Sequence, residues 1–260
     1  MKKIEKEYGF TLVEIMAALA IFLVVVAIVL GIYVQATKYM AYFAAKDDIL
    51  NSMNNFSYQI SKYIDGAAAI FAKVGDTYVP WETMDDVDFS NPDVGVAFFT
   101  KRLKSDGKPE SDYVYIYNEK IKDKNGRQLW FLDATDNNKC KPLTRIVVVI
   151  KETSTDTKVP NADDMVTVDW SNGRKIVFRP SIVDARDAFS YMKFYYYRYE
   201  INQGQQTMVW KELRMKSIFG VLRYIYDDSS CTHRVRGYAV NVYPYTQVFN
   251  VYGRNMERSK

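Results

Sequence analysis

The sequence is poor in the side chains that enzymes and metal sites most often use. It contains one histidine, His233, and two cysteines, Cys140 and Cys231. No serine lies in a Gly-x-Ser-x-Gly turn, so the sequence offers no nucleophile elbow whose serine His233 could activate as a base. The two cysteines and His233 supply at most three soft ligands, which is short of a closed structural zinc site. The sequence therefore predicts no catalytic residue and no bound metal.

Glycine-rich phosphate-binding loops are missing as well. Neither Gly-x-x-x-x-Gly-Lys nor Gly-x-Gly-x-x-Gly occurs, so no nucleotide cofactor is expected. The formal net charge of +4 is small for 260 residues and does not by itself indicate a nucleic-acid partner. We expect a protein that is not an enzyme and that needs no cofactor.

The third absence is of charged side chains in a long segment that begins at residue 15. Residues 15–34 are uncharged and apolar, no Lys, Arg or His lies between Phe10 and Gln35, and Glu14 is the only acid there. Such a run is long enough to span a bilayer, which takes about 20 residues. A carboxylate at the bilayer centre costs about 2.5–3.5 kcal/mol, so Glu14 needs a partner. Cleavage after Gly9 would provide one, because the new amine of Phe10 would lie about one helical turn from Glu14.

The segment from Gly9 through Phe10 to Glu14, Gly-Phe-Thr-Leu-Val-Glu, resembles the cleavage and methylation motif of type IV prepilins and of the pseudopilins of type II secretion. The resemblance implies that prepilin peptidase cuts between Gly9 and Phe10 and N-methylates Phe10. It also implies that Glu14 is the acid used in assembly. Many family members have a kinking proline where this chain has Gly31, and a glycine there loosens the helix less.

Two other interpretations of this segment remain open. A plain signal anchor would make Glu14 an accident near the interface. A secretory signal peptide fits less well, because its apolar region is usually 7–15 residues long and a small-residue cleavage site should follow it. The basic leader, with Lys2, Lys3 and Lys6, favours a cytoplasmic N-terminus.

A second helical pattern follows the apolar run. Ile49, Phe56 and Ile60 lie on an apolar stripe that also holds Met53 and Tyr63, which is typical of an amphipathic helix. We expect one helix to continue to about Asp65 and to stop at Gly66. The predicted parts are a leader at residues 1–9, a transmembrane and assembly helix at 10–37, an amphipathic continuation at 38–66, and a β-rich head at 67–260.

Beyond Gly66 the periodicity shortens to that of strands. Turn signals at Asn125-Gly126, Asn172-Gly173 and residues 202–204 separate β-rich runs. Strands are expected at residues 113–117, 128–132, 144–150, 165–170, 175–178, 193–201, 207–213, 235–242 and 247–252. Residues 67–109 are expected to form a variable loop with short strands. The predicted fold class is α+β, with one long helix against an antiparallel sheet, as in pilins.

Size and a tyrosine-rich strand refine the resemblance. Residues 193–199, a glycine-containing turn and residues 208–213 look like a region of the larger minor pilins and the J-type minor pseudopilins. The ending at residues 248–255 is similar to the strand that closes many prepilins. The resemblance therefore implies a large minor pilin or a J-type minor pseudopilin.

Three further features of the head leave alternatives open. Cys140 and Cys231 would form one bridge in an oxidising compartment, worth about 4–5 kcal/mol in the chain-entropy model, or would remain two buried thiols. The acids around residues 85–93 are either calcium ligands or a solvated loop, and the loop is favoured because the spacing is not that of an EF-hand. Basic and aromatic residues alternate in the last third, which suits DNA, but strand alternation explains them equally.

These observations predict a structural subunit of a type IV pilus or type II secretion filament. The partners implied are prepilin peptidase, other pilin or pseudopilin subunits bound through the N-terminal helix, the inner-membrane assembly machinery, and the membrane before assembly. The predicted location is a single-pass inner-membrane protein with an extracytoplasmic head, which becomes extracellular or periplasmic in a filament. The alternative is a membrane-anchored extracytoplasmic adhesin or a DNA-uptake receptor.

Overall fold

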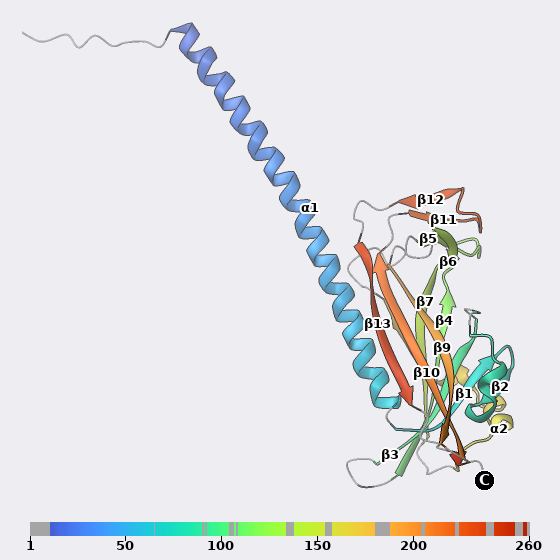
Figure 1. Cartoon of the computed structure of the whole chain (residues 1–260). Coiled ribbons are helices and arrows are strands. Elements are labelled where there is room, and N and C mark those ends of the chain that lie inside the picture. The colour runs from blue at the N-terminus through green and yellow to red at the C-terminus, as the bar shows by residue number, and fades with distance from the viewer. Residues whose placement is uncertain are drawn as a thin grey trace, which may run out of the picture. The chain divides into compact units, whose positions relative to one another are not determined.

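The computed structural model describes most of the chain and is shown in Figure 1. The described residues are 11–64, 66–89, 91, 93–103, 107, 109–133, 138–153, 158–179, 188–203, 206–221, 224–237, 242–252 and 257–258. The predicted leader, with its cleavage and methylation residues Gly9 and Phe10, lies outside them. Contacts divide the chain into two units, Met1–Ala44 and Ala45–Lys260, which are described separately. The boundary predicted after residue 37 stays a prediction.

A single helix, α1 (Leu12–Ile64), contributes to both units. Its part in the second unit carries the predicted apolar stripe, and Ala45, Ile49, Phe56, Ile60 and Tyr63 are buried. The ring of Phe56 lies 5.0 Å from that of Phe178 and 5.7 Å from that of Phe219. Ser52 donates a hydrogen bond of 3.2 Å to the carbonyl of Arg179. The end of α1 at Ile64 agrees with a stop near Gly66.

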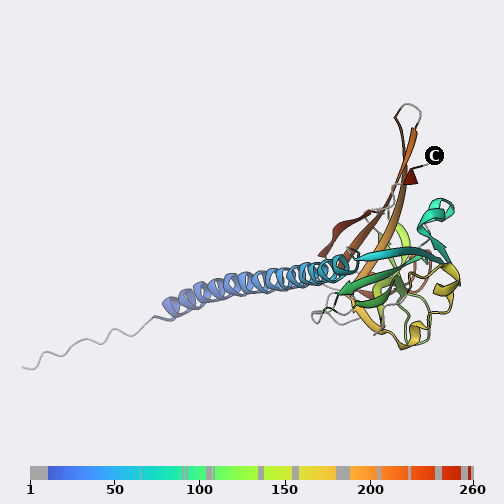
Figure 2. The ribbon, with the colours of Figure 1, turned by 90° about the horizontal axis from the view of Figure 1, so that it is seen from below.

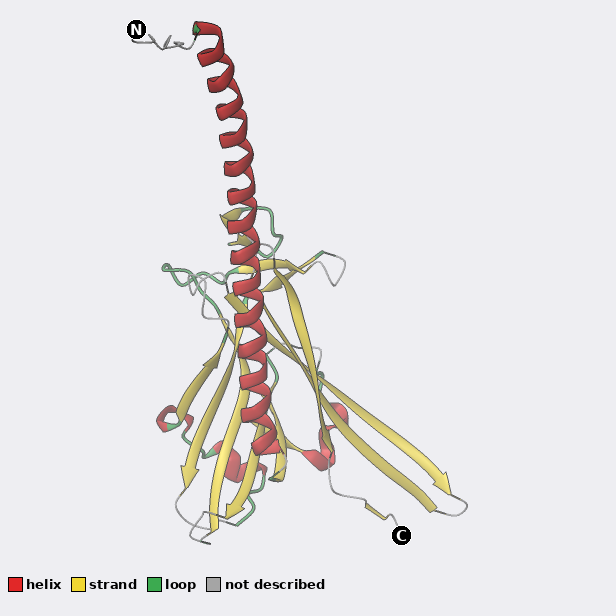
Figure 3. Cartoon of the chain, turned by 90° about the vertical axis from the view of Figure 1, so that its left-hand side faces the viewer, coloured by secondary structure: helices red, strands yellow, loops and turns green. Residues whose placement is uncertain are grey.

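The described strands of the second unit form three antiparallel sheets (Figures 1 and 3). The largest has the order β2-β1-β3-β4-β7-β8, with β1 (Ala67–Val74), β2 (Thr77–Pro80), β3 (Gly95–Leu103), β4 (Pro109–Lys120), β7 (Thr144–Thr153) and β8 (Arg174–Phe178). The second contains β9 (Ala188–Gln203), β10 (Gln206–Val221), β13 (Val242–Tyr252) and β14 (Glu257–Arg258). The third contains β5 (Trp130–Asp133), β6 (Lys139–Pro142), β11 (Tyr224–Tyr226) and β12 (Arg234–Gly237). The α+β prediction, a long helix with antiparallel sheets, is confirmed.

A long hairpin of β9 and β10 links these layers. Its strands pair from Ala188 with Val221 to Gln203 with Gln206, next to the turn that the sequence predicts. Near its base, Phe189 packs with Leu129, Phe131, Leu143 and Ile225 of the third sheet region. The distal part of the hairpin extends away from the six-stranded sheet (Figure 2).

Two sequence predictions for the head are wrong. Residues 165–170 do not form a strand, because the Asn161 side chain accepts from the Asp164 N–H and caps the short helix α2 (Ala162–Val166). Asp169 then caps a 3₁₀ turn, η2 (Trp170–Asn172), by accepting from the Ser171 N–H. Asn172-Gly173 therefore joins η2 to β8 and is not a hairpin turn.

Residues 67–109 are more regular than expected. They contain β1, β2, a 3₁₀ helix η1 (Trp81–Asp86), and β3, which lies inside the six-stranded sheet. Val96, Ala97, Phe98 and Phe99 are all buried, so β3 is covered on both faces. A strand of this kind is a continuous apolar run without alternation, and such a run is easily mistaken for irregular structure between prolines.

Candidate functional site

The N-terminus of α1 is closed by a reciprocal pair of hydrogen bonds between Thr11 and Glu14. The Thr11 N–H donates to Glu14 Oε2 at 2.8 Å, and the Glu14 N–H donates to Thr11 Oγ1 at 3.3 Å. The Thr11 hydroxyl also donates to Glu14 Oε2 at 2.9 Å. This is a capping box, which satisfies two backbone donors that the first helical turn would leave unpaired. Glu14 therefore has a partner within its own chain, as well as a charge that suits a helix N-terminus.

Thr11 was not singled out in the sequence analysis. The signal that could have found it is the pattern Thr-x-x-Glu directly before an apolar run, at residues 11–14. Glu14, by contrast, stands out in the sequence because it is a charged residue at the start of an apolar run. The role of Glu14 in assembly remains a prediction, since its partner in that role would be Phe10 of a processed chain.

After the cap, α1 presents apolar side chains all round. Its most apolar 18-residue window has a mean hydropathy of 3.2 and no buried residue. Leu19, Phe22 and Ile32 are all more than half exposed, and the helix continues through Gly31 without a break. By length and composition this segment could cross a membrane. An apolar surface of this size needs lipid or protein to cover it.

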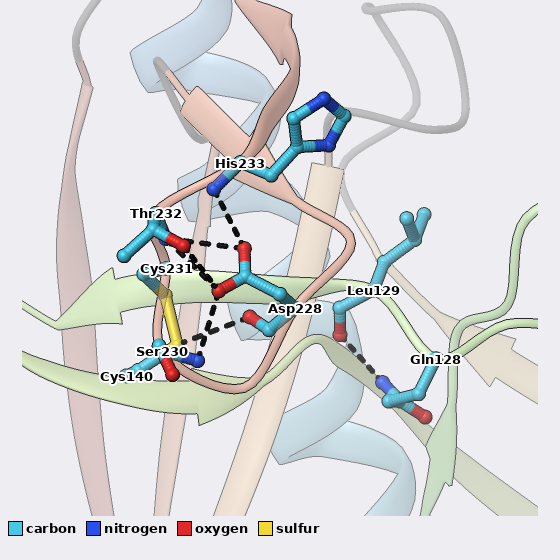
Figure 4. Close-up of a disulfide and its surroundings, with 8 residues drawn as sticks. All are labelled: Gln128, Leu129, Cys140, Asp228, Ser230, Cys231, Thr232 and His233. Carbon is cyan, nitrogen blue, oxygen red and sulfur yellow. Dashed lines mark hydrogen bonds between the residues drawn. A yellow bond between two sulfur atoms is a disulfide. The ribbon is translucent and has the colours of Figure 1, made fainter.

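The two cysteines are joined in the structure, as Figure 4 shows. Cys140 of β6 and Cys231 in the turn between β11 and β12 form a disulfide with Cα atoms 5.8 Å apart. The same turn is organised by Asp228, whose carboxylate accepts from the N–H groups of Ser230, Thr232 and His233. The N–H groups of Thr232 and His233 are the main cause that lowers the Asp228 pKa to about 2. The arrangement is structural in character, since the carboxylate is already fully engaged.

The single histidine has a partner but no nucleophile. His233 is exposed, and its Nδ1 lies 2.6 Å from Oδ1 of Asp227. The second oxygen of Asp227 lies 3.0 Å from Nη1 of Arg127. Asp227 thus contacts both Arg127 and His233 beside the disulfide turn, and the described contacts give His233 no serine or thiol to activate.

The acidic residues considered for calcium do not converge. Asp85 lies 3.3 Å from both Arg198 and Lys211, whereas Asp93 binds Lys120 of β4 at 2.8 Å. Among the residues that the structure describes, no group of three His, Cys, Asp or Glu side chains could hold a metal ion.

The basic residues considered for DNA are partly engaged with acids. Lys211 binds Asp85, and Arg214 makes two hydrogen bonds, of 2.9 and 3.1 Å, to the carboxylate of Glu212. The guanidinium of Arg234 lies over the ring of Tyr224 at 4.6 Å. Arg223 and Arg254, two further basic residues of the last third of the chain, lie outside the described residues. Two of the described basic residues, Lys211 and Arg214, are thus paired with acids.

Comparison with known families identifies the N-terminal segment. The family model of the prokaryotic N-terminal methylation motif matches residues 5–30, which include Gly9, Phe10, Thr11 and Glu14. The resemblance of this segment to the signal of type IV prepilins is thereby confirmed. The match covers about a tenth of the chain and says nothing of the head. Neither the curated proteins nor the solved structures gave a match to this chain.

Proposed function

We propose that the chain is a non-enzymatic subunit of a type IV pilus or type II secretion filament, specifically a large minor pilin or J-type minor pseudopilin. Prepilin peptidase cuts it between Gly9 and Phe10 and methylates Phe10. The subunit then leaves the inner membrane and assembles through its N-terminal helix. The observation that carries the proposal is the methylation motif directly followed by an exposed apolar helix.

Physical chemistry explains why these features belong together. An apolar helical segment with no buried side chain, such as the first part of α1, is stable in lipid before assembly and among like helices after it. In both environments the carboxylate of Glu14 is expensive unless it is paired. Cleavage after Gly9 places a positive amine about one turn away, where it can pair with Glu14 of the same or a neighbouring chain. In the second case the pair fixes the axial offset between neighbouring helices.

The capping box allows the charge of Glu14 to be tested apart from its hydrogen bonds. Glu14→Gln can keep a capping box, because glutamine serves at this helical position, but it has no charge. Glu14→Ala removes both. If assembly depends on the ion pair, the peptidase still processes both variants, but the amount of each in the filament fraction falls tenfold or more. A tenfold fall corresponds to a loss of about 1.4 kcal/mol in the free energy of incorporation. Asp47→Ala is the matched control, since Asp47 is an exposed acid of the same helix outside the apolar run.

The measurement is immunoblotting of sheared filaments and membranes, together with the intact mass of the recovered protein. A chain that begins at methylated Phe10 supports the proposal. An uncut chain in the presence of active peptidase, or full incorporation of Glu14→Ala, contradicts it. The uncut chain would leave a membrane-anchored adhesin or receptor as the better description.

A further inference from the structure

One edge of the long hairpin has no strand beside it. β9 pairs with β10 along its whole length, and no strand in the described part of the chain pairs with the opposite edge of β9. Near the hairpin base this outer edge is covered by side chains. The Met192 N–H donates to Oδ1 of Asn118 at 2.8 Å, and Nδ2 of Asn118 donates to the Met192 carbonyl at 2.7 Å. The side-chain amide of Asn118 thus takes the place of a neighbouring strand.

The covered residues reveal which backbone groups face outward. The Ser190 carbonyl accepts from Oγ1 of Thr144 at 3.0 Å, on the same edge as Met192. Backbone direction alternates along an antiparallel strand, so every second residue faces the same edge. Phe194, Tyr196 and Arg198 therefore also direct their N–H and C=O groups away from β10. Past Asn118, the described residues provide no hydrogen-bond partner for these groups.

A groove borders this open edge. It has a volume of 340 Å³, and it is lined by Asp85, Val87 and Phe89 on one side and by residues 193–197 of β9 on the other. We call it the edge groove. The ring of Phe89 stacks on Tyr196 at 6.0 Å, and Trp81 of η1 meets the same ring edge-on at 5.8 Å. Asp85 holds η1 against the hairpin through Arg198 and Lys211. The apolar wall of the groove is therefore preformed.

The two faces of the hairpin differ in chemistry at this edge. Side chains of even-numbered residues, Phe194 and Tyr196, join Phe89 on the apolar face. On the other face Lys193 is opposite Lys216, and Tyr195 is opposite Arg214. The charged residues on that face of the hairpin are Lys193, Arg214 and Lys216 against Glu212, so three positive charges less one negative one leave +2.

We propose that the edge groove binds an extended acidic segment of another protein, which adds as a strand beside β9. Strand addition would use the open backbone groups of Phe194, Tyr196 and Arg198, and alternate side chains would provide specificity. Every second side chain of the added strand meets the apolar face with Phe89, and the others meet Lys193 and Lys216. The expected ligand alternates apolar and acidic residues. A second copy of this chain would bring the same positive face, with its own Lys193 and Lys216, and like charges oppose that pairing.

A synthetic peptide can test this directly. The probe is a dye-labelled nine-residue peptide of alternating valine and glutamate, and its counterpart has lysine in place of glutamate. Binding is followed by fluorescence anisotropy with the full-length protein in detergent micelles. We expect saturable binding of the glutamate peptide, and at least about tenfold weaker binding of the lysine peptide, because both carry the same apolar face but opposite charge.

Two variants at one position isolate the backbone contribution. Arg198→Ala and Arg198→Pro lose the same side-chain charge, but only proline removes the outward N–H, and proline is tolerated on edge strands. Arg198→Pro should bind the glutamate peptide at least about fivefold more weakly than Arg198→Ala, since one hydrogen bond is lost. Far-UV circular dichroism checks that both variants are folded. Lys193→Glu, which leaves the backbone unchanged, should shift the preference toward the lysine peptide.

Several results would overturn the proposal. These are no binding of the glutamate peptide at millimolar concentration, equal binding of both peptides, or equal affinity of the two Arg198 variants. Self-association of the wild-type protein that Arg198→Pro abolishes, without peptide binding, would assign the edge to a second copy instead. The proposal does not depend on filament assembly, because it concerns the head alone and is measured without a filament.

Discussion

Removal of the disulfide between Cys140 and Cys231 should lower the free energy of unfolding of the head by several kcal/mol. The bridge joins β6 to the turn between β11 and β12, and its cysteines are 91 positions apart in sequence. We consider the double substitution Cys140→Ala and Cys231→Ala. Alanine removes the bond and adds no polar group to the partly buried site.

The expected loss follows from the length of the closed loop. In the chain-entropy model, a loop of 91 residues restricts the unfolded chain by about 15.5 cal/mol/K, or about 4.6 kcal/mol at 25 °C. Measured values usually fall below this estimate, because the unfolded chain retains structure. A loss of about 3–5 kcal/mol is expected, which is a large part of the stability of a typical domain.

Tryptophan fluorescence offers a direct assay. All four tryptophans, Trp81, Trp130, Trp170 and Trp210, follow residue 66 in the sequence, so their emission reports on the head and not on the membrane segment. Guanidinium unfolding of full-length protein in micelles gives the free energy by linear extrapolation. The wild-type protein treated with reductant should match the double variant, and reductant should not affect the double variant.

A loss under about 1 kcal/mol would refute the reasoning from loop closure. It would mean that the β5, β6, β11 and β12 sheet separates from the rest before global unfolding. Two fluorescence transitions in the oxidised protein would show the same thing. A loss of several kcal/mol in one transition supports a single cooperative head.

The remaining predictions concern the helix and the acidic turn. Phe56→Ala should lower the free energy of unfolding by about 3–5 kcal/mol, because Phe56 is fully buried against Phe178 and Phe219. The control Tyr58→Ala, at a 77 % exposed position of the same helix, should lower it by less than about 0.5 kcal/mol. In the second prediction, the pKa of Asp228 is lowered to about 2 in the folded protein, from an ordinary value of 3.8. The ionised carboxylate of Asp228 therefore stabilises the folded protein above pH 4, and this stabilisation is lost as the pH falls toward 2. The difference in free energy of unfolding between wild type and Asp228→Asn should therefore become smaller as the pH falls from 4 to 2. A difference that stays constant would show that the charge of Asp228 does not stabilise the turn.

The elements predicted best from the sequence are those that local pattern specifies. The stripe at Ile49, Phe56 and Ile60 has helical period, and these residues are buried in α1 as expected. The apolar run after Glu14 and the prepilin motif needed no tertiary information either. The long hairpin could be predicted because β-rich runs flank a glycine-containing turn.

The missed elements depend on contacts that the pattern does not contain. Residues 165–170 alternate like a strand, yet the Asn161 cap and burial of Met165 make them helical turns. β3 lacks alternation because both of its faces are covered. The N-terminal cap is the exception, because the pattern Thr-x-x-Glu at residues 11–14 is sufficient to predict the role of Thr11. The edge groove could not be predicted, since it needs the segment at residues 85–89 beside a strand more than a hundred residues later.

The disulfide also determines how the head would respond to pulling. A load applied between α1 and the last strand enters at the N-terminal side of Cys140 and leaves after Cys231. The covalent link carries this load past the 90 residues between the two cysteines, which include β7, β8, β9, β10 and β11. Those residues would otherwise add about 300 Å of extended chain. While the bond is intact, these five strands are excluded from the force path, and tension can extend only the chain outside the loop.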